Sequence, residues 1–336
     1  MSSIEQLTAD ERAVREGAGL LDRSERGKLA LTGGETKRFL QGQVTNDVEA
    51  LVPGSGCYAA FLTAKGKMRG DLRVLDVHVD AREFPGQAGD QAPTGNSQCE
   101  ALLLDCERVA LQDLFTMVRQ FKLGFDVELH RRTLERGLLS LVGPRSRAVL
   151  GDAAAALGEP EHANVAATVD GIAVVLVATD VGVDLIADSA QTDALSRALL
   201  ARGAHAVDEP VVETLRVERG RPRYGAELDD TTIPQEADLN DRAVSFTKGC
   251  YVGQETVARL FYKGKPNRHL RGLRLSAPVA PGTELMLGGK RVGAVGSVAL
   301  SPAHGPIALA LVRREAEPGA TVTAGEATAE VVTLPF

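Results

Sequence analysis

The sequence predicts an α+β protein in two parts. Up to about residue 264, segments with helical spacing of apolar residues alternate with strand-like segments, and two of these strands flank a tight basic turn. After Pro266, glycines and prolines interrupt short apolar runs about every eight to twelve residues, as in antiparallel sandwiches and small barrels. We therefore expect a mixed region at 5–264, made of antiparallel sheets packed by helices, and an all-β domain at 266–336.

The first elements follow from local patterns of apolar residues, glycine and capping residues. In order, they are a helix at 11–16, a strand at 27–32, a helix from Glu35, a strand at 56–62, a turn at 64–68, a strand at 72–79 and a strand at 101–105. The segment 81–98 is rich in glycine, proline and polar residues and is predicted to be a flexible hairpin loop.

The middle of the chain continues in the same manner. It predicts a helix at 111–121, strands at 127–130 and 137–142, a helix at 144–150, strands at 172–178 and 183–186, and helices at 193–201, at 211–219 and from Gln254. Residues 153–169 are rich in alanine but contain Gly158 and Pro160, so we expect a helix and a loop of little chemical interest there.

Composition bounds the function. The chain has 38 basic and 45 acidic residues, a net charge of −7, which argues against broad binding of nucleic acid but leaves room for a local basic patch. No apolar run approaches the roughly 20 residues of a membrane span. The first residues are polar and charged, and we expect a cytoplasmic protein without a membrane partner.

Metal and nucleotide motifs are missing from the sequence. The four cysteines, Cys57, Cys99, Cys106 and Cys250, form no Cys-x-x-Cys pair, which speaks against a zinc ribbon or a self-contained iron–sulfur site. The six histidines share no metal-ligand spacing, so we expect each to be incidental, and no glycine-rich nucleotide loop occurs. The sequence therefore predicts no metal site.

The most distinctive stretch runs from Lys248 to Glu255. Gly249 and Gly253 flank Cys250 and Tyr251, and a helix is expected to start at Gln254. A thiol ahead of a helix N-terminus, with an ammonium nearby, lies where its thiolate is favoured. A small buried cysteine in a tight turn is equally compatible with these residues.

Two further groups of residues could carry chemistry. Asp71, after a basic cluster, could be a general base or bind an amine, although a solvated aspartate explains it as well. Glu218, with Arg216 on the same helix and Tyr224 just after it, could accept two N–H groups of a heterocycle. A structural Arg–Glu pair is the alternative.

Five blocks in the same order resemble a known family. The octet Lys248–Glu255 resembles the signature of the YgfZ family, folate-binding relatives of the glycine cleavage T-protein (aminomethyltransferase). The other blocks that resemble this family are 39–48, 64–71, 215–225 with 233–239, and the glycine-rich C-terminal stretch from 289 to 312. The resemblance implies a three-lobed fold whose α/β lobes enclose a folate-sized channel, with a C-terminal antiparallel β-barrel.

The resemblance also implies a function. It points to maturation or maintenance of iron–sulfur client proteins, including tRNA-modifying enzymes, with tetrahydrofolate or another reduced folate as the ligand. Glu218 matches the carboxylate that holds the pterin ring in T-proteins, and Asp71 falls at, or one residue from, their catalytic aspartate. Cys250 matches the cysteine that separates this family from true T-proteins. Some members use tryptophans around the folate, and this chain has none.

Three hypotheses follow. In the first, the chain is an accessory factor for iron–sulfur proteins, with Cys250 presenting a thiolate beside Lys248 at the mouth of a channel that holds folate through Glu218, Arg216 and Tyr224. In the second, it is a tetrahydrofolate-dependent aminomethyltransferase that uses Asp71. In the third, it contacts tRNA directly through a patch made of Lys65, Lys67, Arg69, Lys263, Lys265 and Arg268, although the net charge makes nucleic acid an indirect partner at most.

Overall fold

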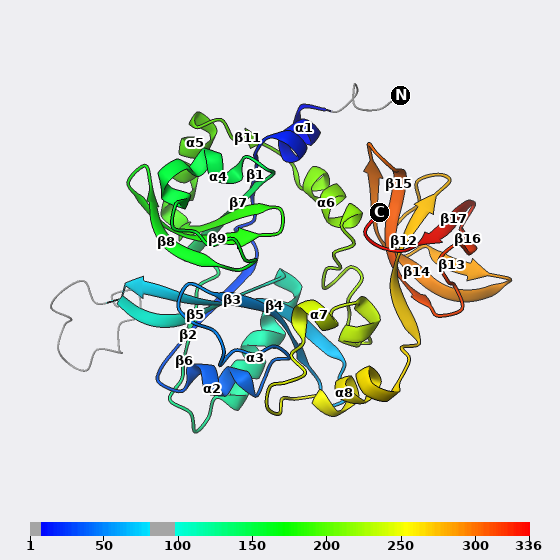
Figure 1. Ribbon diagram of the computed structural model, residues 1–336, viewed down its shortest axis with the longest axis horizontal. Coiled ribbons are helices and arrows are strands. Elements are labelled where there is room, and N and C mark those ends of the chain that lie inside the picture. The colour runs from blue at the N-terminus through cyan, green and yellow to red at the C-terminus, as the bar shows by residue number, and fades with distance from the viewer. Residues whose placement is uncertain (1–7, 81–97) are drawn as a thin grey trace.

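The computed structural model describes residues 8–80 and 98–336 (Figure 1). Most of this part of the chain forms a closed barrel and two sheets with helices on them, and the strands of these sheets are antiparallel except for one parallel pair. This architecture confirms the predicted α+β class. All but the last residue of the loop predicted at 81–98 lies outside the described residues.

The first lobe is a five-stranded sheet in the order β3-β4-β5-β2-β6. The bounds are β2 (Gly27–Thr32), β3 (Gly56–Leu62), β4 (Met68–Asp80), β5 (Gln98–Cys106) and β6 (Glu128–Arg131), with helices α2 (Thr36–Gln41) and α3 (Leu111–Phe121). Apolar residues recur on one side of α3 and are buried against the sheet together with Phe39 and Phe61. Burial of this side explains why the helical spacing was readable from the sequence.

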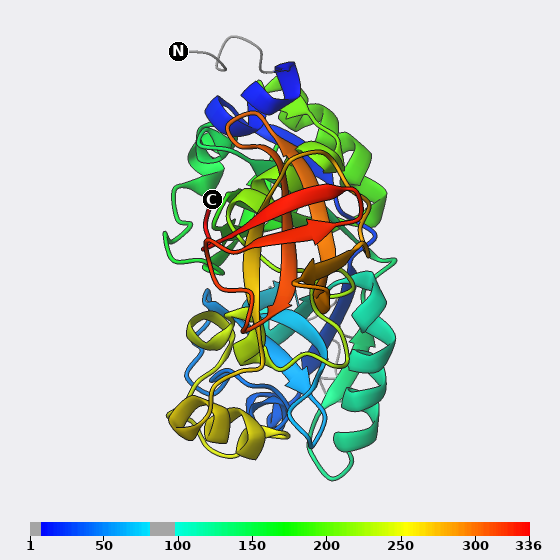
Figure 2. The same ribbon diagram turned by 90° about the vertical axis from the view of Figure 1, so that its right-hand side faces the viewer.

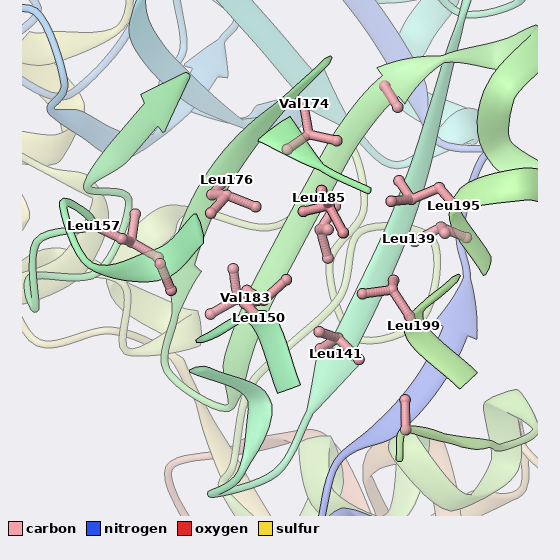
Figure 3. Close-up of a cluster of buried hydrophobic side chains, with 14 of the residues drawn as sticks. Leu139, Leu141, Leu150, Leu157, Val174, Leu176, Val183, Leu185, Leu195 and Leu199 are labelled. Carbon is pink, nitrogen blue, oxygen red and sulfur yellow. The ribbon is translucent and has the colours of Figure 1, made fainter. Parts of the chain in front are cut away.

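The second lobe is a six-stranded sheet in the order β11-β1-β7-β10-β9-β8. The bounds are β1 (Gly19–Asp22), β7 (Arg136–Val142), β8 (Asn164–Val169), β9 (Ile172–Thr179), β10 (Gly182–Asp188) and β11 (His205–Ala206), with α1 (Ala9–Glu16), α4 (Ser146–Leu150) and α5 (Thr192–Ala201). Its core consists of leucines and valines from both strands and helices, among them Leu139, Leu185 and Leu195 (Figure 3).

The prediction for residues 153–169 was wrong in part. Only a short 3-10 turn, η4 (Gly151–Ala154), occurs there, and Asn164–Val169 forms strand β8 instead of continuing as loop. Alanine favours helix intrinsically, but the cross-strand pairing of β8 with β9 along its whole length outweighs this small preference.

A third region connects the lobes to the barrel. It contains α6 (Glu209–Glu218), η6 (Pro234–Ala237), α7 (Asn240–Ala243) and α8 (Gln254–Lys263). Helix α6 packs against β14 (Lys290–Ser301) and β15 (Gly305–Arg313) of the barrel and against α1 (Figure 1). None of the helices in the described part of the chain is both long and apolar enough to cross a membrane.

The C-terminal barrel closes in the order β12-β15-β14-β13-β16-β17. Its strands are β12 (Arg268–Leu275), β13 (Glu284–Leu287), β14 (Lys290–Ser301), β15 (Gly305–Arg313), β16 (Thr321–Ala324) and β17 (Ala327–Val332), and Figure 2 shows them face on. Alternate strand residues fill the interior, and the end of the chain returns to α6, where the Phe336 N–H donates to the Glu218 carbonyl oxygen at 3.0 Å.

Candidate functional site

A cavity of about 200 Å³ lies where the two lobes and α6 meet. Its wall includes residues of β3 and β4 from the first sheet, residues of β7 and β10 from the second, and residues of α6 and α7. Eight arginines and five carboxylates contribute to this wall. The cavity therefore suits a polar ligand that carries negative charge. We call it the central cavity.

Asp71 faces the central cavity from β4. It is only 6% exposed, and the Tyr58 hydroxyl donates to its Oδ2 atom at 2.5 Å. Burial raises the pKa of Asp71 to about 6, against the lowering effect of the Tyr58 hydrogen bond. Residue 70 is a glycine, and a side chain there would collide with the Phe61 ring. Asp71 is thus the carboxylate that this strand presents to the cavity.

A buried ionic network joins the two lobes behind Asp71. Asp105 of β5 accepts from Arg26 at 2.9 Å and from Arg73 of β4 at 2.6 Å. Arg73 also donates to Asp184 of β10 at 2.6 Å, and the Ser140 hydroxyl donates to the same carboxylate. Because one arginine binds a carboxylate from each sheet, the network fixes the two walls of the cavity relative to each other.

The three residues predicted to bind folate are not brought together. Arg216 lines the central cavity, but its guanidinium donates to Glu213, to Glu227 at 3.0 Å and to Ser297 of the barrel. Burial alone would lower the pKa of Arg216, and its carboxylate partners raise it instead. Tyr224 is half-buried against the apolar clusters of the first lobe and α7–α8 and lines neither this cavity nor the one described next.

Glu218 lines a second cavity of about 660 Å³ next to the central cavity. Its Oε1 atom accepts from Arg15 at 2.6 Å and from the Ser301 hydroxyl at 2.5 Å. Among the residues that the structure describes, its Oε2 atom accepts no side-chain hydrogen bond. The two cavities share part of their walls, namely Thr179, Asp180, Val181, Leu215 and Arg219. The two cavities are therefore adjacent, with Asp71 in the wall of one and Glu218 in the wall of the other.

Lys248 is a structural tether. Its Nζ atom donates to the backbone oxygens of Gln41 at 2.6 Å and of Val44 and Asn46 at 2.8 Å. An ammonium has three donors, and all three are used. Burial lowers the pKa of Lys248 to about 8. The tether therefore joins two sequence blocks about 200 residues apart.

The rest of the octet shapes a turn that ends in α8. Tyr251 is buried, with the Lys248 Nζ atom 5.1 Å from its ring centroid. Gly253 has a φ of +85°, and a side chain there would meet the Thr63 carbonyl oxygen at 2.6 Å. Only glycine fits this position. Gln254 and Glu255 form the first turn of α8, as predicted.

Cys250 is exposed and lines neither cavity. Its thiol is not part of the wall of either cavity, and its place at the mouth of a folate channel stays a prediction. Of the other cysteines whose side chains are described, Cys57 is half-buried and Cys106 is buried. Burial raises the pKa of the Cys57 thiol to about 12 and also raises that of the Cys106 thiol. Cys250 is thus the accessible thiol of this set.

The two predicted basic clusters meet at one backbone oxygen. Lys67 donates to the Thr231 carbonyl at 2.5 Å, and Arg268 donates to it at 2.9 Å. Arg69 and Arg268 are paired with Asp113 and Glu236, whereas Lys65, Lys263 and Lys265 are exposed. Near them, α8 carries Phe261, stacked on Phe246 with ring centroids 3.8 Å apart, and the exposed Tyr262.

Among the residues of the central cavity that sequence reasoning missed are Tyr58, Glu161, His162 and Arg242. His162 and Glu161 lie in the segment to which no chemistry was assigned, and no local pattern marks them. Among the residues whose side chains the structure describes, no group of three or more histidine, cysteine, aspartate or glutamate side chains could hold a metal ion.

Comparison with known proteins places this geometry in context. A family model for the GCVT N-terminal domain matches residues 2–84, and one for the glycine cleavage T-protein C-terminal barrel domain matches 268–336. An aminomethyltransferase of Rubrobacter xylanophilus is 30% identical over 344 residues, covering 98% of this chain and 86% of that protein. A protein of Arabidopsis thaliana described as a chloroplastic transferase is 28% identical over 339 residues, covering 96% of this chain and 72% of that protein.

A solved structure extends the likeness to three dimensions. The glycine cleavage system aminomethyltransferase T from Bartonella henselae superimposes with a TM-score of 0.80 at 25% sequence identity. The match covers 97% of this chain and 88% of that one, so it includes both lobes and the barrel.

Proposed function

The chain belongs to the aminomethyltransferase family, and we propose that it binds tetrahydrofolate across the two cavities beside α6. The observation that carries this proposal is the buried Asp71 carboxylate, which faces the central cavity with a pKa raised to about 6. A carboxylate is seldom buried without a counter-ion unless its ionisation has a use.

The residues present fit a reduced folate. The Glu218 Oε2 atom, which accepts no side-chain hydrogen bond from the described residues, can accept from pterin N–H groups, and the arginines of the central cavity suit carboxylates. When bound, tetrahydrofolate supplies the nitrogen that carries a one-carbon unit. Above a pH of about 6, Asp71 is ionised and can accept a hydrogen bond or a proton from an amine, and Tyr58 holds the carboxylate in place.

We further propose that this folate-binding protein is an accessory factor for iron–sulfur client proteins, among them enzymes that modify tRNA. Support comes from Cys250, an exposed thiol within the octet that resembles the YgfZ signature. The exposed rings of Phe261 and Tyr262 on the neighbouring helix α8 provide apolar area that a client protein could cover. One cysteine cannot hold a cluster alone, so the client supplies the remaining ligands.

Aminomethyl transfer to tetrahydrofolate is the second candidate. It is favoured by Asp71 in the cavity and by the relative from Rubrobacter xylanophilus, which is named an aminomethyltransferase. This reaction needs the cavity but gives no role to a thiol that lies outside it.

One set of variants separates the two functions. Cells lacking the protein receive wild type, Cys250→Ala or Asp71→Asn, and iron–sulfur enzyme activities are measured; purified variants are assayed with an aminomethyl-loaded carrier protein and tetrahydrofolate. The accessory role predicts loss of iron–sulfur activity with Cys250→Ala and no aminomethyl turnover by wild type. Turnover that depends on Asp71 but not on Cys250 would establish aminomethyl transfer instead. Failure of wild type to bind tetrahydrofolate in calorimetry would refute the common premise.

A further inference from the structure

His162 lies in the wall of the central cavity with a strained backbone. It precedes strand β8 and has a φ of +71°, in the left-handed region that residues other than glycine rarely adopt. The backbone is held there at both ends: the His162 N–H donates to the Ala178 carbonyl at 2.8 Å, and the Asn164 side-chain amide donates to the His162 carbonyl at 3.3 Å. Such strain persists where the surrounding structure enforces it, often at functional sites.

The imidazole of His162 also makes no hydrogen bond within the described part of the chain. The side chain is only 9% exposed, and its Nδ1 atom has no partner among the described residues. Its Nε2 atom lies 3.6 Å from the Glu161 Oε1 atom, which is too long for a hydrogen bond. That oxygen already accepts from Arg242 at 2.6 Å. A buried polar ring without partners disfavours the folded state.

A line of polar groups connects this ring to Asp71. Arg242, which binds Glu161, lies with its guanidinium carbon 5.4 Å from the centroid of the Tyr58 ring. Tyr58 in turn donates to Asp71. The line runs from the second lobe through α7 to the first lobe, and every member lines the central cavity. His162 and Asp71 therefore face the same ligand volume.

We propose that His162 is a ligand-contacting residue whose imidazole hydrogen-bonds an uncharged polar group, an N–H or a carbonyl of the heterocyclic ring, of the molecule bound in the central cavity. This inference rests on the proposed folate binding. Burial lowers the pKa of His162 to about 4, so the ring is neutral at pH 7 and offers one donor and one acceptor. The arginines of the same wall suit a carboxylate tail, which leaves the ring of the ligand for His162.

Calorimetric titration of the full chain with tetrahydrofolate and with 6-methyltetrahydropterin, which lacks the glutamyl tail, tests the proposal. The variants are His162→Asn, since asparagine tolerates a positive φ, and His162→Gly, which releases the strain. We expect both to weaken both ligands about tenfold or more, roughly the value of one hydrogen bond to a buried partner. The matched control His205→Asn alters a half-exposed imidazole paired with Asp10 and should change neither affinity.

The outcomes are distinguishable. If both His162 variants bind tetrahydrofolate with wild-type affinity and have a lowered Tm, the role of His162 is purely structural and the proposal is overturned. Loss limited to tetrahydrofolate, with the pterin unaffected, would also overturn it, because His162 would then serve the tail. Absence of binding by wild type would refute the proposed function itself. In wild-type protein labelled with 15N-histidine, ligand should shift the His162 resonances, a change that a structural role would not produce.

Discussion

The central cavity and the Lys248–Glu255 octet are built in opposite ways. In the cavity, Asp71 and His162 are buried with unfavourable ionisation or unmet hydrogen bonds. In the octet, the Lys248 ammonium has all three donors satisfied, and Cys250 is left in solvent. A bound ligand can supply partners to polar groups that lack them in the free protein. Groups that already have partners instead hold their segments of the chain in place. The cavity is thus arranged for a ligand. The octet tethers two distant segments of the chain through Lys248 and leaves one thiol exposed.

Removing the tether should have the largest effect on stability. Lys248→Met leaves three backbone oxygens without their donor, so we expect a loss of about 2–4 kcal/mol in the free energy of unfolding. Urea denaturation measures it. Lys263→Met, on an exposed helix end, is the matched control and should stay within about 0.5 kcal/mol. An unchanged midpoint of urea denaturation for Lys248→Met would mean that Lys248 is not a structural tether.

Asp71→Asn should stabilise the protein while impairing its function. The native pKa of about 6 exceeds the unfolded value of about 3.9, so the folded state binds the proton more tightly. Stability that depends on this proton is present below a pH of about 4 and is lost as the pH rises to about 6. At pH 7 the variant should therefore gain on the order of 3 kcal/mol, and below pH 4 the gain should vanish. Denaturation at pH 3.5, 5 and 7 measures this slope, and a gain independent of pH would contradict it.

Glu218→Gln should weaken tetrahydrofolate binding about tenfold, because a charged acceptor is replaced by a neutral one at the second cavity. Calorimetry measures the change. Glu159→Gln alters another carboxylate of the same wall, which is 89% exposed, and should leave the affinity unchanged. Equal affinities for wild type and Glu218→Gln would remove the proposed pterin anchor.

The smallest effect on stability is expected at the thiol. Cys250→Ala should change the free energy of unfolding by less than about 0.5 kcal/mol, since the side chain is exposed. In native protein, iodoacetamide should modify Cys250 well before Cys57 and Cys106, which peptide mass mapping would resolve. Preferential labelling of a buried thiol would show that the octet opens in solution.

The sequence predicts the turn of the octet far better than it predicts the central cavity. Glycine spacing marked the barrel, the hairpin before Asp71 and the turn around Cys250, because these features depend on neighbours along the chain. The partners of Lys248 lie about 200 residues away, and His162 gains its meaning only when β8 pairs with β9 and turns its loop toward the first lobe. Alanine-rich composition concealed that strand, since intrinsic preferences are weaker than pairing.

The hydrogen bonds at the end of α6 give the barrel a part in ligand binding. The Glu218 Oε1 atom accepts from Ser301 of β14, and the Glu218 backbone oxygen accepts from Phe336 at the end of the chain. One residue thus seats the barrel on the lobes and borders the second cavity. A ligand that drew this carboxylate away from Ser301 would loosen the seam between barrel and helix. Occupancy of the cavity would then be communicated to a surface of the molecule that the ligand never touches.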